Sequence, residues 1–309
     1  MTPPHGLRGP TPGAAQQMEV QVGLLQGLVV ATVTPLREDG SLDLPSLGAH
    51  IRDLVQASAE GLFVAGTTGE GLLLEEDERV AVTEAAVRET AGRVPVVALC
   101  GGLSTARSIR LARRMREAGA DGLAVLTPFY YRVDAAAMVE HFARVADAAG
   151  CPTYLYSIPG LTGVSLPTEV LRQVSGHPRF GGLKFSCCDL PQLKAYVGTG
   201  APVLIGCDSL ITEALRCGAA GTVSGTAAAV PAPFGRLFTI LRRGEDSAPA
   251  QEMATRLDAL MASLPPIAGY KAALLRRGVI ASAAVRRPLR PLTAEEQARL
   301  EAGLRALGL

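Results

Sequence analysis

The chain has 309 residues, of which 48% are hydrophobic and 19% charged, and this composition is typical of a globular protein with a large core. Its formal net charge of +1 provides no long-range field, which argues against nucleic acid or an anionic membrane as the main partner. No apolar run reaches the length of about 18 residues that a membrane span needs, so we expect no such span.

The N-terminal segment over residues 1–22 is rich in proline and glycine. It has no continuous apolar stretch of the kind found in signal peptides. We therefore expect residues 1–22 to form a disordered tail.

The six cysteines lie mostly in apolar runs and show no CxxC spacing. This predicts reduced, packed thiols in a cytoplasmic protein, while the role of the adjacent Cys187 and Cys188 stays open. The four histidines are scattered and none pairs with acidic residues at metal-ligand spacing, which predicts that the protein has no metal site.

Eight short apolar runs of β-forming residues follow the tail. They begin near Leu28, Gly61, Val94, Gly122, Thr153, Gly181, Pro202 and Gly221. Amphipathic segments with helical spacing, such as residues 105–118, lie between them, and such alternation predicts a parallel sheet covered on both faces. Eight units fit a (β/α)8 TIM barrel over residues 23–244. A doubly wound open sheet is the alternative, although no GxGxxG follows the first run.

Four further helical patterns occupy residues 233–243, 247–263, 267–277 and 293–307. The first completes the barrel, and the others predict a C-terminal helical subdomain over residues 245–309. Thr293 and Glu296 have the spacing of a capping box at the start of the last helix.

Lys184 lies in the middle of the apolar run over residues 181–186. Only three of the 30 basic residues are lysines, so a lysine here indicates chemistry that arginine cannot perform. A buried lysine has a lowered pKa, and its neutral amine can attack a carbonyl carbon to form a Schiff base. Residue type and position alone leave open a second explanation, a strand-end lysine that reaches solvent or pairs with a carboxylate.

Polar residues gather where the predicted strands end, which is where TIM barrels place their catalytic side chains. They are Thr67, Thr68, Tyr130, Tyr156 and Asp208, and Gly206 lies two residues before Asp208. The glycine-flanked threonine pair can bind a small carboxylate, and tyrosines near an amine can relay protons. Taken singly, the threonine motif could also be a helix-entry turn, and the tyrosines could be core or interface residues.

Five motifs carry a resemblance to a known family: GTTGE (66–70), TPFYY (127–131), YSIPGLTG (156–163), GLKFS (182–186) and GCD (206–208). Over residues 24–292 the chain resembles the dihydrodipicolinate synthase/N-acetylneuraminate lyase family of class I, Schiff-base pyruvate enzymes. The resemblance implies a homotetramer built as a dimer of dimers, with no metal and no organic cofactor, that acts on small 2-oxo acids and aldehydes.

The same resemblance implies roles for individual residues. Lys184 would form the imine with pyruvate, and Tyr156 would shuttle protons. Thr67 and Thr68 would bind the pyruvate carboxylate, with Thr67 also part of the proton relay. Tyr130 matches a relay tyrosine that reaches across a tight dimer interface.

Substrate specificity beyond pyruvate is expected to depend on Ser186, Gly206, Asp208, Ser209 and Leu161. The synthase branch has an arginine at the position of Leu161 that grips a carboxylate, so the leucine argues against aspartate semialdehyde. Asp208 matches an aspartate that binds sugar hydroxyls in the sialic acid lyases. Ser209 and Gly225, however, replace a glutamate and a serine of those lyases, which favours a shorter sugar acid.

The predicted function is therefore the reversible aldol cleavage of a 2-keto-3-deoxy sugar acid through a Lys184–pyruvate imine. Alternatives with the same imine are an N-acetylneuraminate lyase, a 4-hydroxy-tetrahydrodipicolinate synthase and a dehydratase of a related acid. A catalytically silent 2-oxo acid binding protein is an alternative of a different class, and a phosphate-binding barrel enzyme is supported only weakly by residues 224–226.

Overall fold

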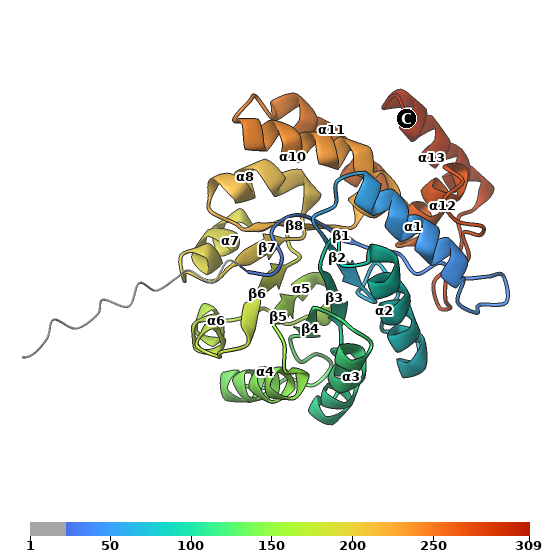
Figure 1. Cartoon of the computed structure of the whole chain (residues 1–309). Coiled ribbons are helices and arrows are strands. Elements are labelled where there is room, and N and C mark those ends of the chain that lie inside the picture. Colours follow the sequence, from blue (N-terminus) through green and yellow to red (C-terminus); the bar gives the residue numbers. More distant parts are fainter. Residues whose placement is uncertain (1–22) are drawn as a thin grey trace, which may run out of the picture.

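Eight parallel strands form a closed barrel in the computed structural model, which describes residues 23–309 (Figure 1). The strands are β1 (Gly27–Ala31), β2 (Gly61–Val64), β3 (Val96–Leu99), β4 (Gly122–Leu126), β5 (Thr153–Ser157), β6 (Phe180–Phe185), β7 (Val203–Ile205) and β8 (Gly221–Ser224). Each strand pairs with its sequence neighbours, and β8 pairs with β1. The predicted TIM barrel is confirmed, and the open-sheet alternative is wrong. The tail predicted over residues 1–22 lies outside the described residues.

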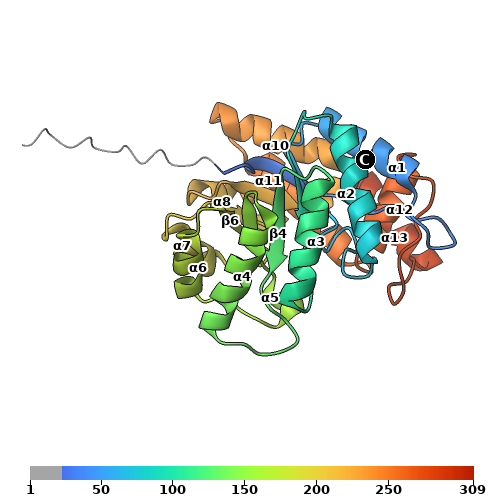
Figure 2. The same cartoon turned by 60° about the horizontal axis from the view of Figure 1, so that its bottom comes forward.

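Helices surround the barrel, with the short α5 at one end of it (Figures 1 and 2). They are α1 (Leu44–Gln56), α2 (Glu76–Thr90), α3 (Thr105–Glu117), α4 (Ala135–Ala149), α5 (Pro159–Thr162), α6 (Thr168–Ser175), α7 (Leu190–Val197), the 3₁₀ helix η1 (Asp208–Leu210), α8 (Ile211–Arg216), α9 (Thr226–Ala229), α10 (Pro231–Arg243), α11 (Ala248–Ala262), α12 (Ala268–Arg276) and α13 (Ala294–Ala306). The segment predicted over residues 105–118 is α3. Among the described residues, no helix is both long and apolar enough to cross a lipid bilayer.

The core has two layers because successive side chains of a strand point to opposite faces of the sheet. In β1, Val29 belongs to the cluster inside the barrel and Val30 to the cluster between strands and helices. Tyr154 and Tyr156 are two residues apart in β5, so both belong to the inner cluster. The barrel interior is thus filled by side chains, and a small molecule can enter only at an end of the barrel.

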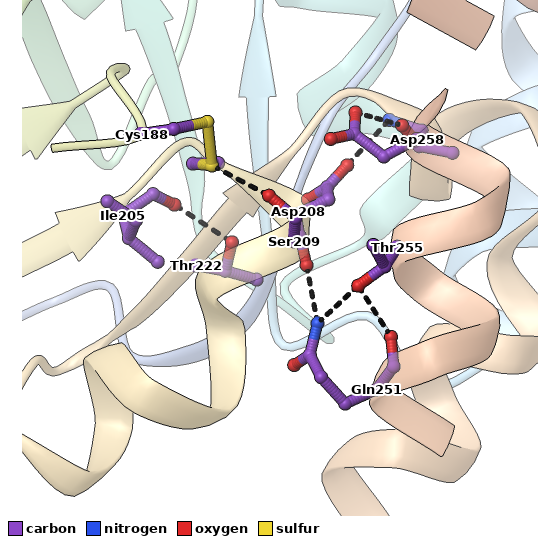
Figure 3. Close-up of a disulfide and its surroundings, with 10 residues drawn as sticks. Cys188, Ile205, Asp208, Ser209, Thr222, Gln251, Thr255 and Asp258 are labelled. Atoms are coloured by element: carbon purple, nitrogen blue, oxygen red, sulfur yellow. Dashed lines mark hydrogen bonds between the residues drawn. A yellow bond between two sulfur atoms is a disulfide. The ribbon is translucent and has the colours of Figure 1, made fainter. Parts of the chain in front are cut away.

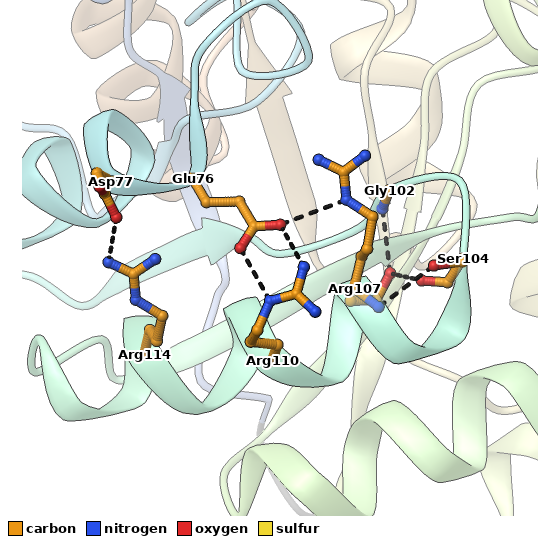
Figure 4. A network of polar contacts seen from close by, with 8 residues as sticks. Glu76, Asp77, Gly102, Ser104, Arg107, Arg110 and Arg114 are labelled. Atoms are coloured by element: carbon orange, nitrogen blue, oxygen red, sulfur yellow. Dashed lines mark hydrogen bonds and ion pairs between the residues drawn. The ribbon is translucent and has the colours of Figure 1, made fainter.

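Ion pairs join α2 to α3 on the outer surface (Figure 4). Glu76 accepts hydrogen bonds from Arg110 at 2.8 and 3.1 Å and pairs with Arg107, while Asp77 accepts one from Arg114 at 2.6 Å. The side chains of Arg107 and Arg110 are more than half exposed, and so is that of Asp77, the partner of Arg114. Each pair therefore contributes only a few tenths to about 1 kcal/mol.

The helices α11, α12 and α13 follow the barrel, in the region of the predicted appendage (Figure 1). α11 packs against α10 and η1, and α12 packs against α9 and α13. The predicted capping box of α13 is confirmed, because Thr293 Oγ1 accepts from the Glu296 N–H and the Glu296 carboxylate accepts from the Thr293 N–H.

Candidate active site

Lys184 lies in β6 with its side chain inside the barrel, and the residue is only 4% exposed. Its Nζ atom lies 3.8 Å from the centroid of the Phe63 ring and 4.1 Å from that of the Tyr156 ring. Burial lowers the pKa of Lys184 below its ordinary value of 10.5, and the neighbouring Tyr156 opposes this shift only in part. The result is an amine held against two aromatic faces and biased toward its neutral form.

The other two lysines are in different environments. Lys194 lies exposed on α7, whereas Lys271 on α12 is buried and forms an ion pair with Glu70. Among the ion pairs of the described residues, none includes Lys184. The explanation of Lys184 as a lysine that reaches solvent or a carboxylate is therefore wrong.

Tyr156 and Thr67 form a hydrogen-bonded pair next to this amine. The Tyr156 hydroxyl lies 3.2 Å from Thr67 Oγ1, and β5 pairs with β6 so that Tyr156 is directly opposite Lys184. The Tyr156 ring also contacts Phe63 edge to face, with 5.7 Å between ring centroids. These contacts join one side chain from each of β5, β6 and the loop after β2 at the carboxyl end of the barrel.

The loop that carries the threonine pair is a chain of tight turns between β2 and α2. The Gly71 N–H donates to Gly66 O at 2.9 Å, and Thr34 Oγ1 donates to Gly69 O at 2.7 Å. A Cβ atom at residue 71 would collide with the carbonyl group of Ala65, so this turn requires glycine. Since α2 begins only at Glu76, the alternative of a helix-entry turn is wrong.

Gly206 directly follows β7 and lies against the residues at the carboxyl end of β6. Its N–H donates to Phe185 O at 2.7 Å, and a Cβ atom here would lie 3.0 Å from Ser186 Cβ and collide with the Ser186 hydroxyl. The predicted residues Ser186 and Gly206 are thus neighbours at the same end of the barrel as Lys184.

Asp208 is 5% exposed, and its side chain joins the segment after β7 to the carboxyl end of β8. Its Oδ2 atom accepts hydrogen bonds from Ser224 Oγ at 2.9 Å and from the Thr226 N–H at 3.3 Å. Burial, and then the nearby carboxylate of Asp258, raises the pKa of Asp208 to about 6. Among the described residues, no partner donates to its other oxygen, Oδ1.

A disulfide joins Cys188 in the loop after β6 to Cys207 in the loop after β7 (Figure 3). The expectation of reduced thiols is wrong for this pair, since neighbouring parallel strands bring the residues that follow them together, with 5.4 Å between the two Cα atoms. Cys207 Sγ also lies 3.2 Å from Ser209 Oγ. Cys187, next to the disulfide, remains a free thiol.

Two predicted residues lie apart from this cluster. Tyr130 is 80% exposed, with a φ of +72°, and its ring packs edge to face on that of Tyr131. Leu161, on α5, is 70% exposed. Within the described chain, neither residue has a hydrogen bond or ring contact to Lys184.

Three residues near the site were not identified from the sequence: Phe63, Asp258 and Tyr270. Phe63 could have been found, because the period of two in β2 directs it into the barrel. Asp258 and Tyr270 come from α11 and α12, where no local pattern indicates a neighbour in the barrel. A Cβ atom at Gly225 would lie 3.3 Å from both the Tyr270 hydroxyl and Thr68 Oγ1, so α12 closes this side of the site.

The described residues contain no group of three or more His, Cys, Asp and Glu side chains that could hold a metal ion. The polar groups next to Lys184 are instead the hydroxyl of Tyr156 and, hydrogen-bonded to it, that of Thr67. Such groups suit the carboxylate and carbonyl oxygens of a small organic acid.

Comparisons with known proteins find relatives along nearly the whole chain. The model of the family described as the dihydrodipicolinate synthetase family matches residues 24–307. A Halobacterium salinarum protein described as an uncharacterized DapA-like lyase is 38% identical over 304 residues, which cover 97% of this chain and 98% of that protein. A 4-hydroxy-tetrahydrodipicolinate synthase of Xanthomonas axonopodis is 36% identical over 282 residues, which cover 88% and 91%.

A solved structure is similar over the same region. It is that of YagE from E. coli K12, described as a prophage protein of the dihydrodipicolinic acid synthase family in complex with pyruvate. The TM-score is 0.89 at 29% sequence identity, and the match covers 93% of this chain and 99% of that chain.

Proposed function

The chain belongs to the dihydrodipicolinate synthetase family, whose enzymes perform carbon–carbon bond chemistry, and on that premise we propose that it cleaves and forms a 2-keto-3-deoxy sugar acid through a pyruvate imine on Lys184. The observation that carries the proposal is the position of Lys184 Nζ, which is buried between the rings of Phe63 and Tyr156 and has no carboxylate partner among residues 23–309. Burial favours the neutral amine, which is the form that attacks a carbonyl.

Imine formation requires a group that moves protons at the attacked carbon. The lone pair of Lys184 attacks the C2 ketone to give a carbinolamine, and the C2 hydroxyl then leaves as water with a proton from Tyr156. The Tyr156 hydroxyl is beside both the amine and Thr67 Oγ1, which supports this role. Thr67 and Thr68 bind the substrate carboxylate in our proposal, and the complex of YagE with pyruvate supports a small 2-oxo acid as the ligand.

Cleavage follows from the charge of the imine. The electrons of the C3–C4 bond pass into the protonated imine to give an enamine, and the C4 hydroxyl loses its proton to the Tyr156 oxygen as the aldehyde leaves. Protonation of the enamine at C3 and hydrolysis then release pyruvate and restore Lys184. None of these reaction steps requires a metal or an organic cofactor.

We assign contacts with the part of the substrate beyond C3 to side chains at the carboxyl ends of β6 and β7. Asp208, with one carboxylate oxygen not used by the described residues, and Ser186 are our candidates for contacts with substrate hydroxyls. Ser209 and the backbone of Gly206 also line this part of the site in our proposal. Leu161 in place of an arginine supports a sugar acid over aspartate semialdehyde.

We also propose that the protein is a homotetramer built from tight dimers. Tyr130 and Tyr131 are 80% and 69% exposed, and Leu72 and Leu103 are exposed as well, which is unusual for large apolar groups unless another surface covers them. In such a dimer, Tyr130 would reach the site of the partner subunit.

A screen for pyruvate release tests the proposal. The enzyme is incubated separately with 2-keto-3-deoxy acids of different chain lengths and with N-acetylneuraminate. In a parallel assay, the condensation of pyruvate with aspartate semialdehyde is measured. We expect the largest kcat/KM for a 2-keto-3-deoxy sugar acid. A higher value for semialdehyde condensation would favour the synthase, and no turnover by a protein that still binds pyruvate would favour the silent binder.

A further inference from the structure

The loop that carries Thr67 and Thr68 also holds a buried charge that the proposed mechanism does not use. Glu70 is the last residue of the GTTGE motif, and its backbone has a φ of +57°, which is unusual for a residue other than glycine. Its side chain is completely buried and pairs with the ammonium group of Lys271, which is also completely buried. Both charged groups are therefore enclosed by protein.

Among the described residues, the other groups that bond to these two side chains come from the C-terminal part of the chain. The second oxygen of Glu70 accepts a hydrogen bond from the Arg286 N–H, and Lys271 Nζ donates to Ala284 O at 2.7 Å. The Arg286 guanidinium in turn contacts Glu78 on α2, at 2.8 and 3.1 Å. The linker between α12 and α13 is thus attached to the loop after β2 through residues more than 200 positions away.

Stability alone is a poor explanation for such a pair. The cost of removing two charges from water often equals or exceeds the gain from their attraction, and well-packed apolar residues can replace buried ion pairs without loss. What the pair does provide is a fixed geometry, because an ammonium and a carboxylate that are both enclosed cannot be rearranged without leaving a charge unpaired.

That geometry is transmitted directly to the threonine pair. The Glu70 N–H donates to Thr67 O at 3.1 Å, and the Leu73 N–H donates to Glu70 O at 2.7 Å. Any shift of Glu70 therefore moves Thr67, whose hydroxyl lies 3.2 Å from that of Tyr156. Binding of a small carboxylate by hydroxyls and N–H groups depends on such fixed positions.

We propose that Glu70 and Lys271 are positioning residues: their buried ion pair uses α12 and the linker after it to hold the GTTGE loop in the conformation that binds the substrate carboxylate. The inference rests on the proposed function, in which Thr67 and Thr68 bind that carboxylate. Neither Glu70 nor Lys271 contacts the reacting atoms. Lys271 is excluded as the imine-forming lysine, because its ammonium group is already occupied by Glu70 and Ala284 O.

The test uses a double variant, Glu70→Gln with Lys271→Met, which removes both charges and keeps the approximate shapes. Single variants would leave one charge buried without a counter-ion and would lose stability for that reason alone. The probe is pyruvate itself, with borohydride to trap the imine on Lys184 and mass spectrometry to measure the adduct at each pyruvate concentration. Circular dichroism and the oligomer size establish that each protein is folded.

We expect the folded double variant to need at least tenfold more pyruvate for half-maximal adduct than the wild type, while the maximal adduct on Lys184 is retained. The matched control is Asp53→Asn with Arg277→Met. Asp53 lies on α1 and Arg277 directly follows α12, with 2.7 Å between Arg277 Nη2 and Asp53 Oδ1. This pair therefore also joins the C-terminal part to the helices around the barrel, but it includes no residue of the GTTGE loop. The control should leave half-saturation within twofold of the wild type.

An unchanged half-saturating concentration in the folded double variant would overturn the positioning role and leave the proposed function intact. Absence of any adduct in the wild type would overturn both. If the double variant does not fold, Glu70→Asp is measured instead; it keeps both charges but shortens the carboxylate arm by one methylene. For that variant we expect at least a threefold increase, and a wild-type value would again overturn the positioning role.

Discussion

Replacing Tyr156 with phenylalanine should lower the turnover rate greatly and the free energy of unfolding only slightly. The variant keeps the ring, with its edge-to-face contact to Phe63, and loses only the hydroxyl that faces Thr67 Oγ1 at 3.2 Å. One hydrogen bond between neutral groups contributes about 0.5–1.5 kcal/mol, so the free energy of unfolding should fall by about 1 kcal/mol.

The effect on turnover should be much larger. Loss of a positioned acid–base group lowers a rate by about 10²- to 10⁴-fold, which corresponds to about 3–5 kcal/mol in the barrier. Protonation of the nucleophile cannot explain this loss, because Tyr156 raises the pKa of Lys184 and its removal therefore makes the amine more neutral. Two quantities are measured for each protein: kcat for pyruvate release, and the free energy of unfolding in urea.

The strand itself offers a matched control in Tyr154→Phe. Tyr154 is two residues away in β5 and equally buried, but its hydroxyl accepts a hydrogen bond from the Leu25 N–H at 2.7 Å. This variant leaves a buried donor unpaired, so it should lose about 1–3 kcal/mol of stability and keep kcat within threefold. If kcat of Tyr156→Phe is also within threefold of the wild type, the assignment of Tyr156 as the proton carrier is wrong.

Three further predictions concern residues in the segments that directly follow β6 and β7. Gly206→Ala should lose about 1–3 kcal/mol of stability in urea unfolding, because the new Cβ collides with Ser186; an unchanged value would mean that the two exits are not in contact. Reduction of the Cys188–Cys207 disulfide, with its sequence separation of 19, should cost about 3 kcal/mol, seen as a lower Tm with dithiothreitol that Cys188→Ser reproduces; a Tm insensitive to reductant would contradict the disulfide. The pKa of Asp208 is raised from 3.8 to about 6 in the folded protein, so the folded state retains a proton that the unfolded state releases between these values. Its contribution to stability should therefore decrease as the pH rises from about 4 to 6, by about 2–3 kcal/mol, and Asp208→Asn should remove this slope.

The barrel could be predicted from the sequence because its signals are local. Each strand is a short apolar run, each helix has its own period, and eight repeats of this unit leave few ways to close a parallel sheet. Lys184, Thr67, Tyr156 and Gly206 could be found for the same reason, since TIM barrels collect functional side chains at the carboxyl ends of their strands.

The contacts that were missed join segments far apart in the chain. Nothing around Glu70 indicates that Lys271, 201 positions later, would pair with it, and nothing around Cys188 indicates Cys207. Asp208 was predicted only as a substrate contact, whereas its carboxylate also bonds to residues of β8 and the start of α9. The partner of Glu70 depends on how α12 folds back over the barrel, and the partners of Cys188 and Asp208 depend on which strand ends lie side by side. No local pattern encodes either.

The most direct test of the central claim is reduction of the intact protein with borohydride in the presence of pyruvate, followed by peptide mapping. We expect a stable carboxyethyl group on Lys184, none on Lys271 or Lys194, and none in Lys184→Arg, which should remain folded and inactive. An unmodified Lys184, under conditions that trap the imine of a known class I aldolase, would contradict the account.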